Sequence, residues 1–501
     1  MLAVDRAPIH ARQFVLGPSQ RKEHDDWTCL PIDDRLILSH CPRLRVRQIT
    51  DRVGRRWSLL GLAVQSDPAR ESPEEELAAY GQGDIASVYE SWAGRWIMIG
   101  EGQLHLDPGG LLGCYYLQEA GDPPAGPWLS SSLALLSELG GQEVPESRRR
   151  CLTKGDGFCW DPPPRTCYAG IAKLLPTQSL DLASGRVLPR KPFPDAAPAI
   201  TYEELLDRVA ECLTTTVRNL ADADRQLWVA LSAGYHSRLL LAAALNAGAE
   251  FRTYTQTFPL MLRADRELPA ELSNAVGVEY VVRSPGAEVA TLRDRMDKHS
   301  HGQYVDADRT FYAKRQWDWP GPADIALRGG GFELGQCYYW PLLADRPGLD
   351  RVLAAFGAEL SPGYVKDGLA DYLAWVSRHP IADMDWRDRW YLDIRLGGWQ
   401  STEEQALDLL SGTSFIPGNN ARLYRLLLQV PTEVRQSKRH FVDLIDRLWP
   451  GLTAYPFNAR DSVLQGTIRR LHKYASIFHQ TGAWNASYQL GAALRRRLHR
   501  A

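Results

Sequence analysis

Small and hydroxyl-bearing residues are concentrated at positions 231–237, which read Leu231, Ser232, Ala233, Gly234, Tyr235, His236 and Ser237. Small residues allow the backbone to approach an anion, and a helix N-terminus adds free N–H groups and a positive dipole end. The hydroxyl of Ser237 would lie at the turn, within reach of a phosphate oxygen. This stretch, the cradle loop, therefore predicts a phosphate-binding site. An ordinary tight turn from a strand into a helix fits the same residues equally well.

A second candidate stretch, the glycine loop, covers residues 328–333 and places Gly329, Gly330 and Gly331 shortly before an acid, Glu333. Consecutive glycines after a strand indicate a backbone that lies close to a ligand. In that case Gly330 and Gly331 would contact the nucleotide, and the carboxylate of Glu333 would face a metal ion or a substrate. The alternative is a flexible turn with a solvated glutamate.

The elements that must position these loops alternate between strands and helices. An apolar run at 227–230 precedes the cradle loop, and a helical pattern from Leu239 to Leu245 follows it. Further strands are expected at 251–258, 279–282 and 325–327, with a helix from about 267 to 276. This alternation predicts a parallel sheet, in which ligands bind at the carboxyl ends of the strands. Both loops would then lie at the same edge.

The first 190 residues have a different pattern, with short strands separated by turn signals. Strands are expected at 57–62, 94–99 and 111–117, and a helix from Ser72 to Tyr80. This pattern predicts a mostly antiparallel α+β domain over 1–190. A proline-rich linker is expected over 191–200 and a second domain over 201–501, helical from Asp371 onward and ending in a basic helical tail, 469–501.

Composition limits the classes of function. The chain has 501 residues, a formal net charge of −2 and 44% hydrophobic residues. This is ordinary for a soluble globular protein and gives no reason to expect nucleic acid or a membrane as a partner. The eight cysteines form no CxxC pair and no zinc-type cluster, and the N-terminus has no signal-type apolar core. We therefore expect free thiols and a cytoplasmic location.

Taken in order, these motifs resemble the asparagine synthetase-like ATP pyrophosphatases, which include asparagine synthetase, the β-lactam synthetases and the lasso-peptide cyclases. The family loop SGGxDS corresponds to residues 232–237, and its glycine-rich acidic loop to residues 329–333. Residues 94–99, 107–110 and 170–176 resemble its glutaminase domain, and 431–435 with Lys438 resemble a helical motif at its active-site edge. The resemblance implies an N-terminal Ntn-type, glutaminase-like sandwich. A parallel-sheet ATP-pyrophosphatase domain with a helical C-terminal part would follow, using ATP and Mg²⁺.

Two departures from the family pattern bear on activity. The family's glutaminase nucleophile is a cysteine directly after the initiator Met, whereas this chain begins Met1-Leu2-Ala3-Val4 and its first cysteine is Cys29. The resemblance therefore implies a degenerate glutaminase domain. His236 stands where the family has an Asp that would hold Mg²⁺, and Mg²⁺ rarely accepts imidazole. Either Glu333 and the phosphates hold the metal, or nucleotide chemistry is weakened.

Two functions are compatible with these residues. The first is an ATP-dependent, AMP-forming ligase that joins a carboxylate to an amine on a small molecule or a peptide. In it, Lys438 or Arg328 would stabilise charge, and Tyr338 or Tyr339 would orient a nucleophile. The second is a binding or scaffold protein of a biosynthetic complex that keeps the fold without the reaction. A partner protein or a homodimer is compatible with either.

Overall fold

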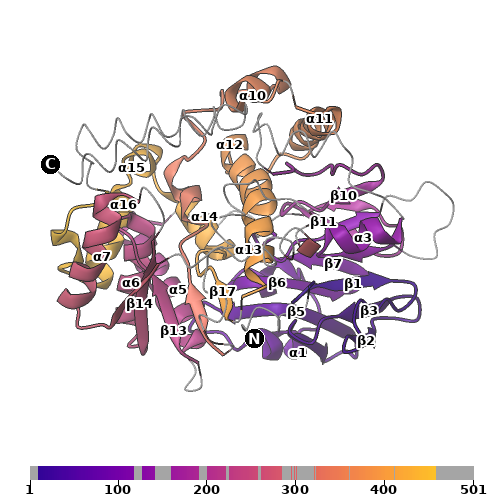
Figure 1. Ribbon diagram of the computed structural model, residues 1–501, viewed down its shortest axis with the longest axis horizontal. Coiled ribbons are helices and arrows are strands. Elements are labelled where there is room, and N and C mark those ends of the chain that lie inside the picture. The colour runs from indigo at the N-terminus through magenta and orange to yellow at the C-terminus, as the bar shows by residue number, and fades with distance from the viewer. Residues whose placement is uncertain are drawn as a thin grey trace, which may run out of the picture.

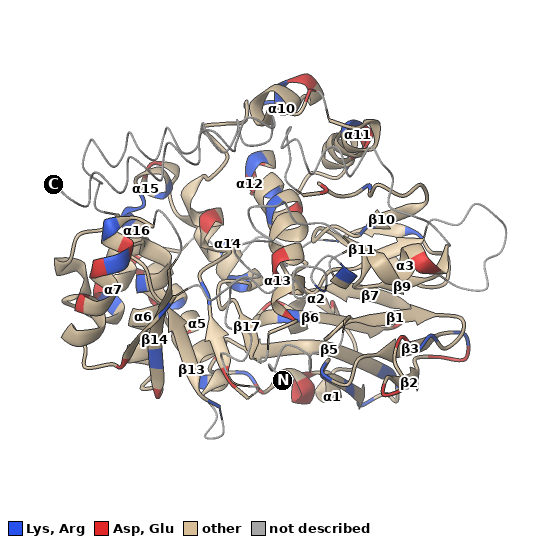
Figure 2. Ribbon diagram, viewed as in Figure 1, with Lys and Arg blue, Asp and Glu red and all other residues tan. Residues whose placement is uncertain are grey.

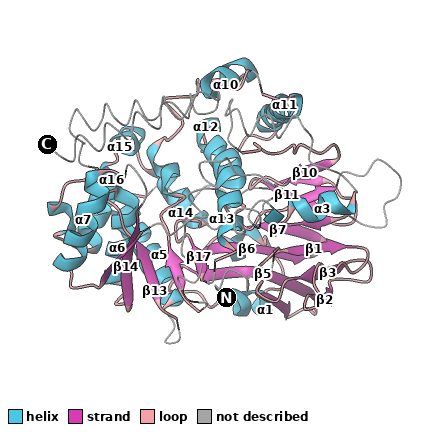
Figure 3. Ribbon diagram, viewed as in Figure 1, coloured by secondary structure: helices cyan, strands magenta, loops and turns pink. Residues whose placement is uncertain are grey.

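The computed structural model describes residues 9–117, 127–140, 160–190, 200–221, 225–257, 261–284, 295, 298–299, 301, 321, 323–359, 361–410 and 412–458. Antiparallel strands form one side of the molecule, a parallel sheet with its helices forms the other, and further helices lie above the junction (Figures 1 and 3). The expected order of an antiparallel part, a parallel α/β part and C-terminal helices is confirmed. Most of the expected linker, 191–199, and the basic tail, 469–501, lie outside the described residues.

The N-terminal part consists of two six-stranded antiparallel sheets, in the orders β10-β8-β9-β1-β3-β2 and β12-β11-β7-β6-β5-β4. Alternate apolar residues of both sheets, such as Phe14, Leu60 and Ile97, form one shared core, which makes this part a sandwich. The strands are Phe14–Gly17 (β1), Thr28–Pro31 (β2), Ile37–His40 (β3), Val46–Thr50 (β4), Arg56–Gln65 (β5), Trp92–Gly100 (β6), Gln103–Leu106 (β7), Tyr115–Leu117 (β8), Leu129–Ser130 (β9), Ile171–Lys173 (β10), Gln178–Asp181 (β11) and Val187–Pro189 (β12).

Among the described residues, three short helices accompany the sandwich: α1 (Pro73–Ala79), α2 (Ala86–Tyr89) and α3 (Leu133–Leu139). The predicted helix at 72–80 is α1, which Ser72 and Glu75 begin with a capping box. The predicted strand at 111–117 is wrong in its first half, because β8 begins only at Tyr115. The buried Asp107 carboxylate accepts hydrogen bonds from the backbone N–H groups of Leu111 and Leu112, which hold this segment in a turn.

The third sheet has five parallel strands in the order β15-β14-β13-β16-β17. Leu227 and Val229 of β13 face a large core shared with five helices, whereas Trp228 on the opposite face packs with Tyr254 and Ala326. The strands are Leu227–Ala230 (β13), Phe251–Gln256 (β14), Tyr280–Arg283 (β15), Ile325–Leu327 (β16) and Thr413–Phe415 (β17), and the helices are Tyr202–Leu220 (α5), Tyr235–Asn246 (α6), Arg263–Ala275 (α7), Ala421–Gln429 (α14) and Arg439–Leu448 (α16). The α7 helix begins about one turn before the predicted start at 267.

A long helical rod crosses the junction between the two parts. Its middle segment, η3 (Tyr391–Gln400), is a π-helix, flanked by α12 (Trp386–Trp390) and α13 (Ser401–Leu407). Figure 2 shows charged positions of both signs along this rod, and many of them are buried. The other helices that the described ranges contain are Leu349–Phe356 (α10), Gly363–Arg378 (α11) and Thr432–Ser437 (α15), with short 3₁₀ turns at Phe332–Gln336 (η2) and Leu452–Ala454 (η4).

Polar side chains fasten the sandwich to the parallel sheet. The amide of Asn419 donates to the carbonyl of Gly94 and to the Asp107 carboxylate, and that of Asn420 donates to Ser66 Oγ. Asn420 also caps α14 by accepting from the N–H of Leu423. Because these contacts are buried, the two parts hold each other in register.

Candidate functional site

The cradle loop lies where the alternation of strands and helices predicts it, at the carboxyl end of β13 and before α6. The N–H of Leu231 donates to the carbonyl of Tyr254 at 2.8 Å, which continues the pairing between β13 and β14 by one residue. Gly234 is the N-cap of α6, and no side chain caps this helix. The helix therefore presents its positive end at this edge of the sheet.

The loop holds its own shape through short hydrogen bonds. Ser237 Oγ accepts from the N–H of Ser232 at 3.0 Å and lies 2.9 Å from the Ser232 hydroxyl. The N–H of Gly234 donates to Ser232 Oγ at 3.2 Å, and the N–H of Ala233 donates to Asp265 Oδ1 at 2.9 Å. An anion would therefore meet the first turn of α6, at Tyr235 and His236, rather than the N–H groups of 232–234.

Arg238 fastens the segment 452–458 beside the loop. Its fully buried guanidinium donates to the carbonyls of Leu452, Tyr455 and Pro456 at 2.8–3.2 Å and lies 3.9 Å from the centre of the Phe457 ring. Burial lowers the pKa of Arg238 to about 10, so the group stays charged at neutral pH. The same Phe457 stacks on Tyr235 with ring centres 4.6 Å apart. The segment 452–458 thus forms one wall of the candidate site.

The glycine loop follows β16, the strand beside β13, and comes close to the cradle loop. A Cβ atom on Gly329 would lie 3.3 Å from Cβ of His236, so the two loops touch there. Gly331 has φ of +79°, and a Cβ atom there would lie 2.7 Å from the Tyr424 hydroxyl. The conformation and the close packing both require glycine at 331.

The two loops meet at a histidine and a glutamate. His236 Nδ1 lies 3.6 Å from Glu333 Oε1, and both side chains are mostly buried. The hydroxyl of Tyr391, in the π-helix, donates to Glu333 Oε2 at 2.6 Å. Burial by itself raises the pKa of Glu333, but the neighbouring His236 and the hydrogen bond from Tyr391 outweigh it and lower that pKa to about 2. Glu333 is therefore ionised at neutral pH.

This set of donors does not fit a magnesium site held by the protein. Both Glu333 oxygens have partners, one of which is an imidazole, and Mg²⁺ prefers an octahedron of oxygen ligands. In the part of the chain that the structure describes, no group of three or more His, Cys, Asp or Glu side chains could hold a metal ion. The expectation that Glu333 is a metal ligand thus gains no support from the contacts of its carboxylate.

A cavity of about 680 Å³ brings two further predicted residues together. Tyr338 and Lys438 both line it, with Trp340 and Arg387. The Tyr338 ring lies 5.7 Å from the Tyr391 ring, and Lys438 Nζ lies 5.9 Å from the centre of the Tyr235 ring. We call this cavity the side cavity. Its Tyr338 lies near Tyr391, which binds Glu333, and its Lys438 lies near Tyr235, which precedes His236.

Two residues of the side cavity have a left-handed backbone without being glycine: Cys337 with φ of 51° and Lys438 with φ of 63°. Lys438 joins α15 to α16, and the buried Arg435 of α15 donates to the carbonyl of Leu334 and pairs with Asp388. The resembling motif 431–438 is thus tied to the segment after the glycine loop. Non-glycine residues in this conformation are often kept where function needs them.

The other predicted residues have structural partners. Arg328 pairs with Glu403 and Glu404 at 2.8 and 2.7 Å, which places its charge in the junction with α13. Tyr339 is buried in the helical core, whereas Tyr338 is 46% exposed. Of the two tyrosines, only Tyr338 could contact a ligand.

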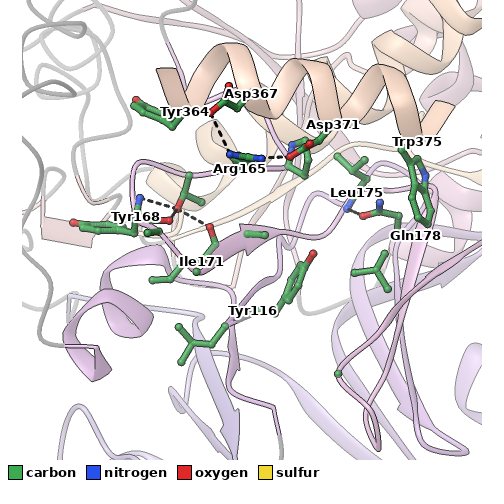
Figure 4. Close-up of a pocket in the computed structure, with 18 of the residues that line it drawn as sticks. Tyr116, Arg165, Tyr168, Ile171, Leu175, Gln178, Tyr364, Asp367, Asp371 and Trp375 are labelled. Atoms are coloured by element: carbon green, nitrogen blue, oxygen red, sulfur yellow. Dashed lines mark hydrogen bonds and ion pairs between the residues drawn. The ribbon is translucent and has the colours of Figure 1, made fainter. Parts of the chain in front are cut away.

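A larger cavity, of about 1070 Å³, lies apart from these residues, between the sandwich and α11 (Figure 4). Arg165 spans it by pairing with Asp367 and Asp371 of α11, and Tyr116, Tyr168 and Trp375 contribute aromatic surface. No residue of the cradle loop or the glycine loop lines this cavity. The predicted chemistry therefore does not extend to it.

Sequence reasoning missed two residues of the site: Asp265, which accepts from the cradle loop, and Tyr391. It placed Arg238 at the end of the cradle stretch without predicting that Arg238 holds the segment 452–458. Asp265 and Arg238 lie in the first turns of α7 and α6, where a charged residue near a predicted loop is a usable signal. Tyr391 comes from a helix 58 residues beyond Glu333, and no local pattern marks it.

Comparisons with known proteins give limited similarity. No family model matches the chain, and no curated protein matches it. Among solved structures it is similar to NMN synthetase from Francisella tularensis, with 11% identity, a TM-score of 0.18 and coverage of 38% of this chain and 93% of that one. It is also similar to glutamine-dependent NAD+ synthetase from Acinetobacter baumannii in complex with ADP, with 12% identity, a TM-score of 0.23 and coverage of 66% and 67%. At these values neither similarity assigns a family or an activity.

The described helices also show whether any of them could span a membrane. Within the described ranges, no helix has the length and apolar character needed to cross a membrane.

Proposed function

We propose that the chain is an ATP-dependent, AMP-forming ligase that joins a carboxylate to an amine. In this proposal it resembles asparagine synthetase and its relatives, with ATP bound at the cradle loop and the glycine loop. In this proposal the first turn of α6, which includes His236 and Ser237, contacts the phosphates. Ser232, Gly234, Gly330 and Gly331 shape the two loops around the nucleotide, and Lys438 and Tyr338 lie beside the substrate.

The observation that carries this proposal is the meeting of two loops from neighbouring parallel strands. The loops after β13 and β16 come together at His236 and Glu333, 3.6 Å apart, at the carboxyl edge of the sheet. In open α/β sheets this edge is where ligands bind. The side cavity, which is lined by a lysine and an exposed tyrosine, is linked to this edge by the contacts of Tyr338 with Tyr391 and of Lys438 with Tyr235.

The proposed chemistry has two steps. An oxygen of the substrate carboxylate attacks the α-phosphorus of ATP, pyrophosphate leaves, and an acyl-adenylate forms. The amine nitrogen then attacks the acyl carbon, AMP leaves, and the amine gives up one proton. Lys438 would offset the negative charge that develops on the phosphates, and the first turn of α6 would bind pyrophosphate. Positioning of the reactants supplies the remaining acceleration.

Glu333 has an electrostatic role in this proposal. A carboxylate whose pKa is lowered to about 2 is a weak base at neutral pH, so it would not take the proton of the amine. Its charge instead orients His236, whose imidazole can donate a hydrogen bond to a phosphate oxygen. No step requires a metal ligand from the protein.

Glutamine hydrolysis is not part of the proposed activity. Burial raises the pKa of Cys114 to about 12 and that of Cys212 to about 11, which leaves both thiols protonated and unreactive. Cys29 lies in β2, with its sulfur 3.4 Å from the Ser39 hydroxyl. If the protein releases ammonia from glutamine and Cys29→Ala abolishes that release, the protein is a glutaminase that uses Cys29.

The test of the proposal is ATP–pyrophosphate exchange with a panel of small carboxylates and carboxyl-terminal peptides, together with equilibrium ATP binding. Exchange that depends on one class of carboxylate supports the ligase. ATP binding without exchange by any carboxylate favours a nucleotide-binding protein, and the absence of both removes the proposal.

A second candidate function is a scaffold protein that keeps the fold without the reaction. The hydrogen bonds within the cradle loop favour it, because the N–H groups of Ser232, Ala233 and Gly234 already have acceptors. The same experiment separates the two functions, since a scaffold binds neither ATP nor pyrophosphate.

A further inference from the structure

A second candidate binding site lies at the amino ends of the parallel strands, at the edge of the sheet opposite the cradle loop. A cavity of about 480 Å³ is lined by Arg225, which precedes β13, by Ile325, which begins β16, and by Thr413, which begins β17. These are the amino ends of parallel strands, whereas the cradle loop follows the carboxyl end of β13. At about 3.3 Å per residue, the length of β13 alone separates the two by about 13 Å.

The lining of this cavity, the arginine cavity, is strongly positive. It includes five arginines, Arg12, Arg43, Arg45, Arg95 and Arg225, and one carboxylate, Asp408. This is an excess of four positive charges among the described lining residues. Glu74, which pairs with Arg45 at 2.6 Å outside the lining, reduces the excess to three.

Asp408 is already engaged by one of the arginines. Arg95 holds it with two parallel hydrogen bonds of 2.7 and 2.8 Å, and Arg12 approaches it at 3.8 Å. Arg12 donates in addition to the carbonyls of Asp408 and Gly412, and Arg43 donates to the carbonyl of Leu410 at 2.8 Å. These contacts fix the directions of the guanidinium groups.

The positively charged arginines repel one another, and this repulsion is stronger because the cavity is partly closed to solvent. The Arg12 side chain is only 13% exposed. Its pKa is lowered to about 10 by burial, against the effect of Asp408, and further by Arg43 and Arg95. A bound anion would remove this repulsion, and planar guanidinium groups suit phosphate and carboxylate oxygens.

The walls also limit the kind of ligand. Leu62, Leu112 and Phe415 provide apolar surface beside the arginines. The volume suits a small molecule rather than a folded partner. We propose that the arginine cavity binds a small molecule bearing phosphate or carboxylate groups, at a site separate from the cradle loop.

The experiment measures binding of inorganic phosphate and of citrate by calorimetry at low ionic strength, with the full chain and no nucleotide. The expected result is that one or both bind. We expect Arg225→Gln, an exposed position, and Arg43→Gln each to weaken binding about fivefold or more. Arg35→Gln, an exposed arginine outside the cavity, serves as the control with unchanged affinity. Tighter binding of phosphate assigns a phosphate ligand, and tighter binding of citrate assigns a polycarboxylate.

A variant of the other site keeps this proposal separate from the proposed function. Gly234→Val alters the cradle loop, so it should remove any phosphate bound there. It should leave citrate binding, and the phosphate binding of the arginine cavity, unchanged. The proposal is overturned if neither anion binds at about 10 mM, if Arg225→Gln and Arg43→Gln both bind as the wild type does, or if Gly234→Val abolishes binding. Each variant's melting temperature shows that it is folded.

Discussion

The imidazole of His236 and the carboxylate of Glu333 face each other across 3.6 Å, one from each of the loops that the sequence marks as candidates. The hydroxyl of Tyr391 completes the group by donating to the second carboxylate oxygen. The ionised carboxylate of Glu333 and its two partners lead to specific predictions about stability, metal response and activity.

Glu333→Gln should destabilise the protein in a pH-dependent way. Because the folded pKa of Glu333 is lowered to about 2 from an ordinary value of 4.5, its stabilisation is present above pH 4.5 and lost as the pH falls toward 2. The expected cost of the variant is on the order of 2–3 kcal/mol at pH 7, falling to less than about half of that by pH 3. Urea midpoints at several pH values measure it. The surface variant Glu279→Gln is the control, and a pH-independent cost for Glu333→Gln would contradict the pairing.

His236→Asp should make stability depend on Mg²⁺. The change places two carboxylates in a mostly buried position, where their repulsion costs about 2 kcal/mol, and it supplies a second oxygen ligand for a divalent ion. We expect a lower melting temperature that millimolar Mg²⁺ recovers, measured by thermal denaturation with and without the ion. His236→Asn, which adds no charge, should show no such recovery. An equal response of both variants would mean that the ion acts elsewhere.

Arg238→Lys should loosen the segment 452–458. A single ammonium cannot replace a planar guanidinium that donates to several carbonyls, so we expect a loss of about 2–4 kcal/mol of stability. Hydrogen exchange should quicken at the N–H of Asn458, which donates to the carbonyl of Ala233. The matched change Arg252→Lys alters an exposed arginine of β14 and should leave that exchange unchanged. Unaltered exchange in Arg238→Lys would show that other contacts hold the segment.

Lys438→Met should reduce ATP–pyrophosphate exchange about a hundredfold, since it removes a cation placed beside the candidate nucleotide site. Arg439→Met provides a close control. Arg439 is the next residue in the chain, and its side chain is 74% exposed and pairs with Asp443. Both variants should melt as the wild type does. Equal exchange rates in the two variants would remove Lys438 from the catalytic site.

How much of this site the sequence predicts depends on how local each contact is. The cradle loop follows from a strand, small residues and a helix in succession, and the approach of Glu333 follows because parallel strands end at one edge. Tyr391 could not be predicted, because it reaches Glu333 from a π-helix that has no distinct sequence pattern. The arrangement of Arg12 and Asp408, which are 396 positions apart, depends on how the sandwich packs against the sheet. No single sequence motif predicts that packing.

The fold, too, is predictable where it depends on local sequence patterns. The alternation in 227–327 predicts the parallel sheet, and the strands of the first 190 residues predict the antiparallel part. Errors occur where a buried polar side chain overrides an apolar run. At 111–114 the Asp107 carboxylate binds two backbone N–H groups and prevents the expected strand.

The most direct test of the central claim is equilibrium binding of a non-hydrolysable ATP analogue, α,β-methylene ATP, to the wild type and to Gly234→Val. We expect the wild type to bind the analogue with a dissociation constant of about 1 mM or tighter and pyrophosphate to displace it. Gly234→Val, once shown to be folded, should bind the analogue clearly more weakly. Absence of binding at several times that concentration, or equal binding by the two proteins, would contradict a nucleotide site at the cradle loop.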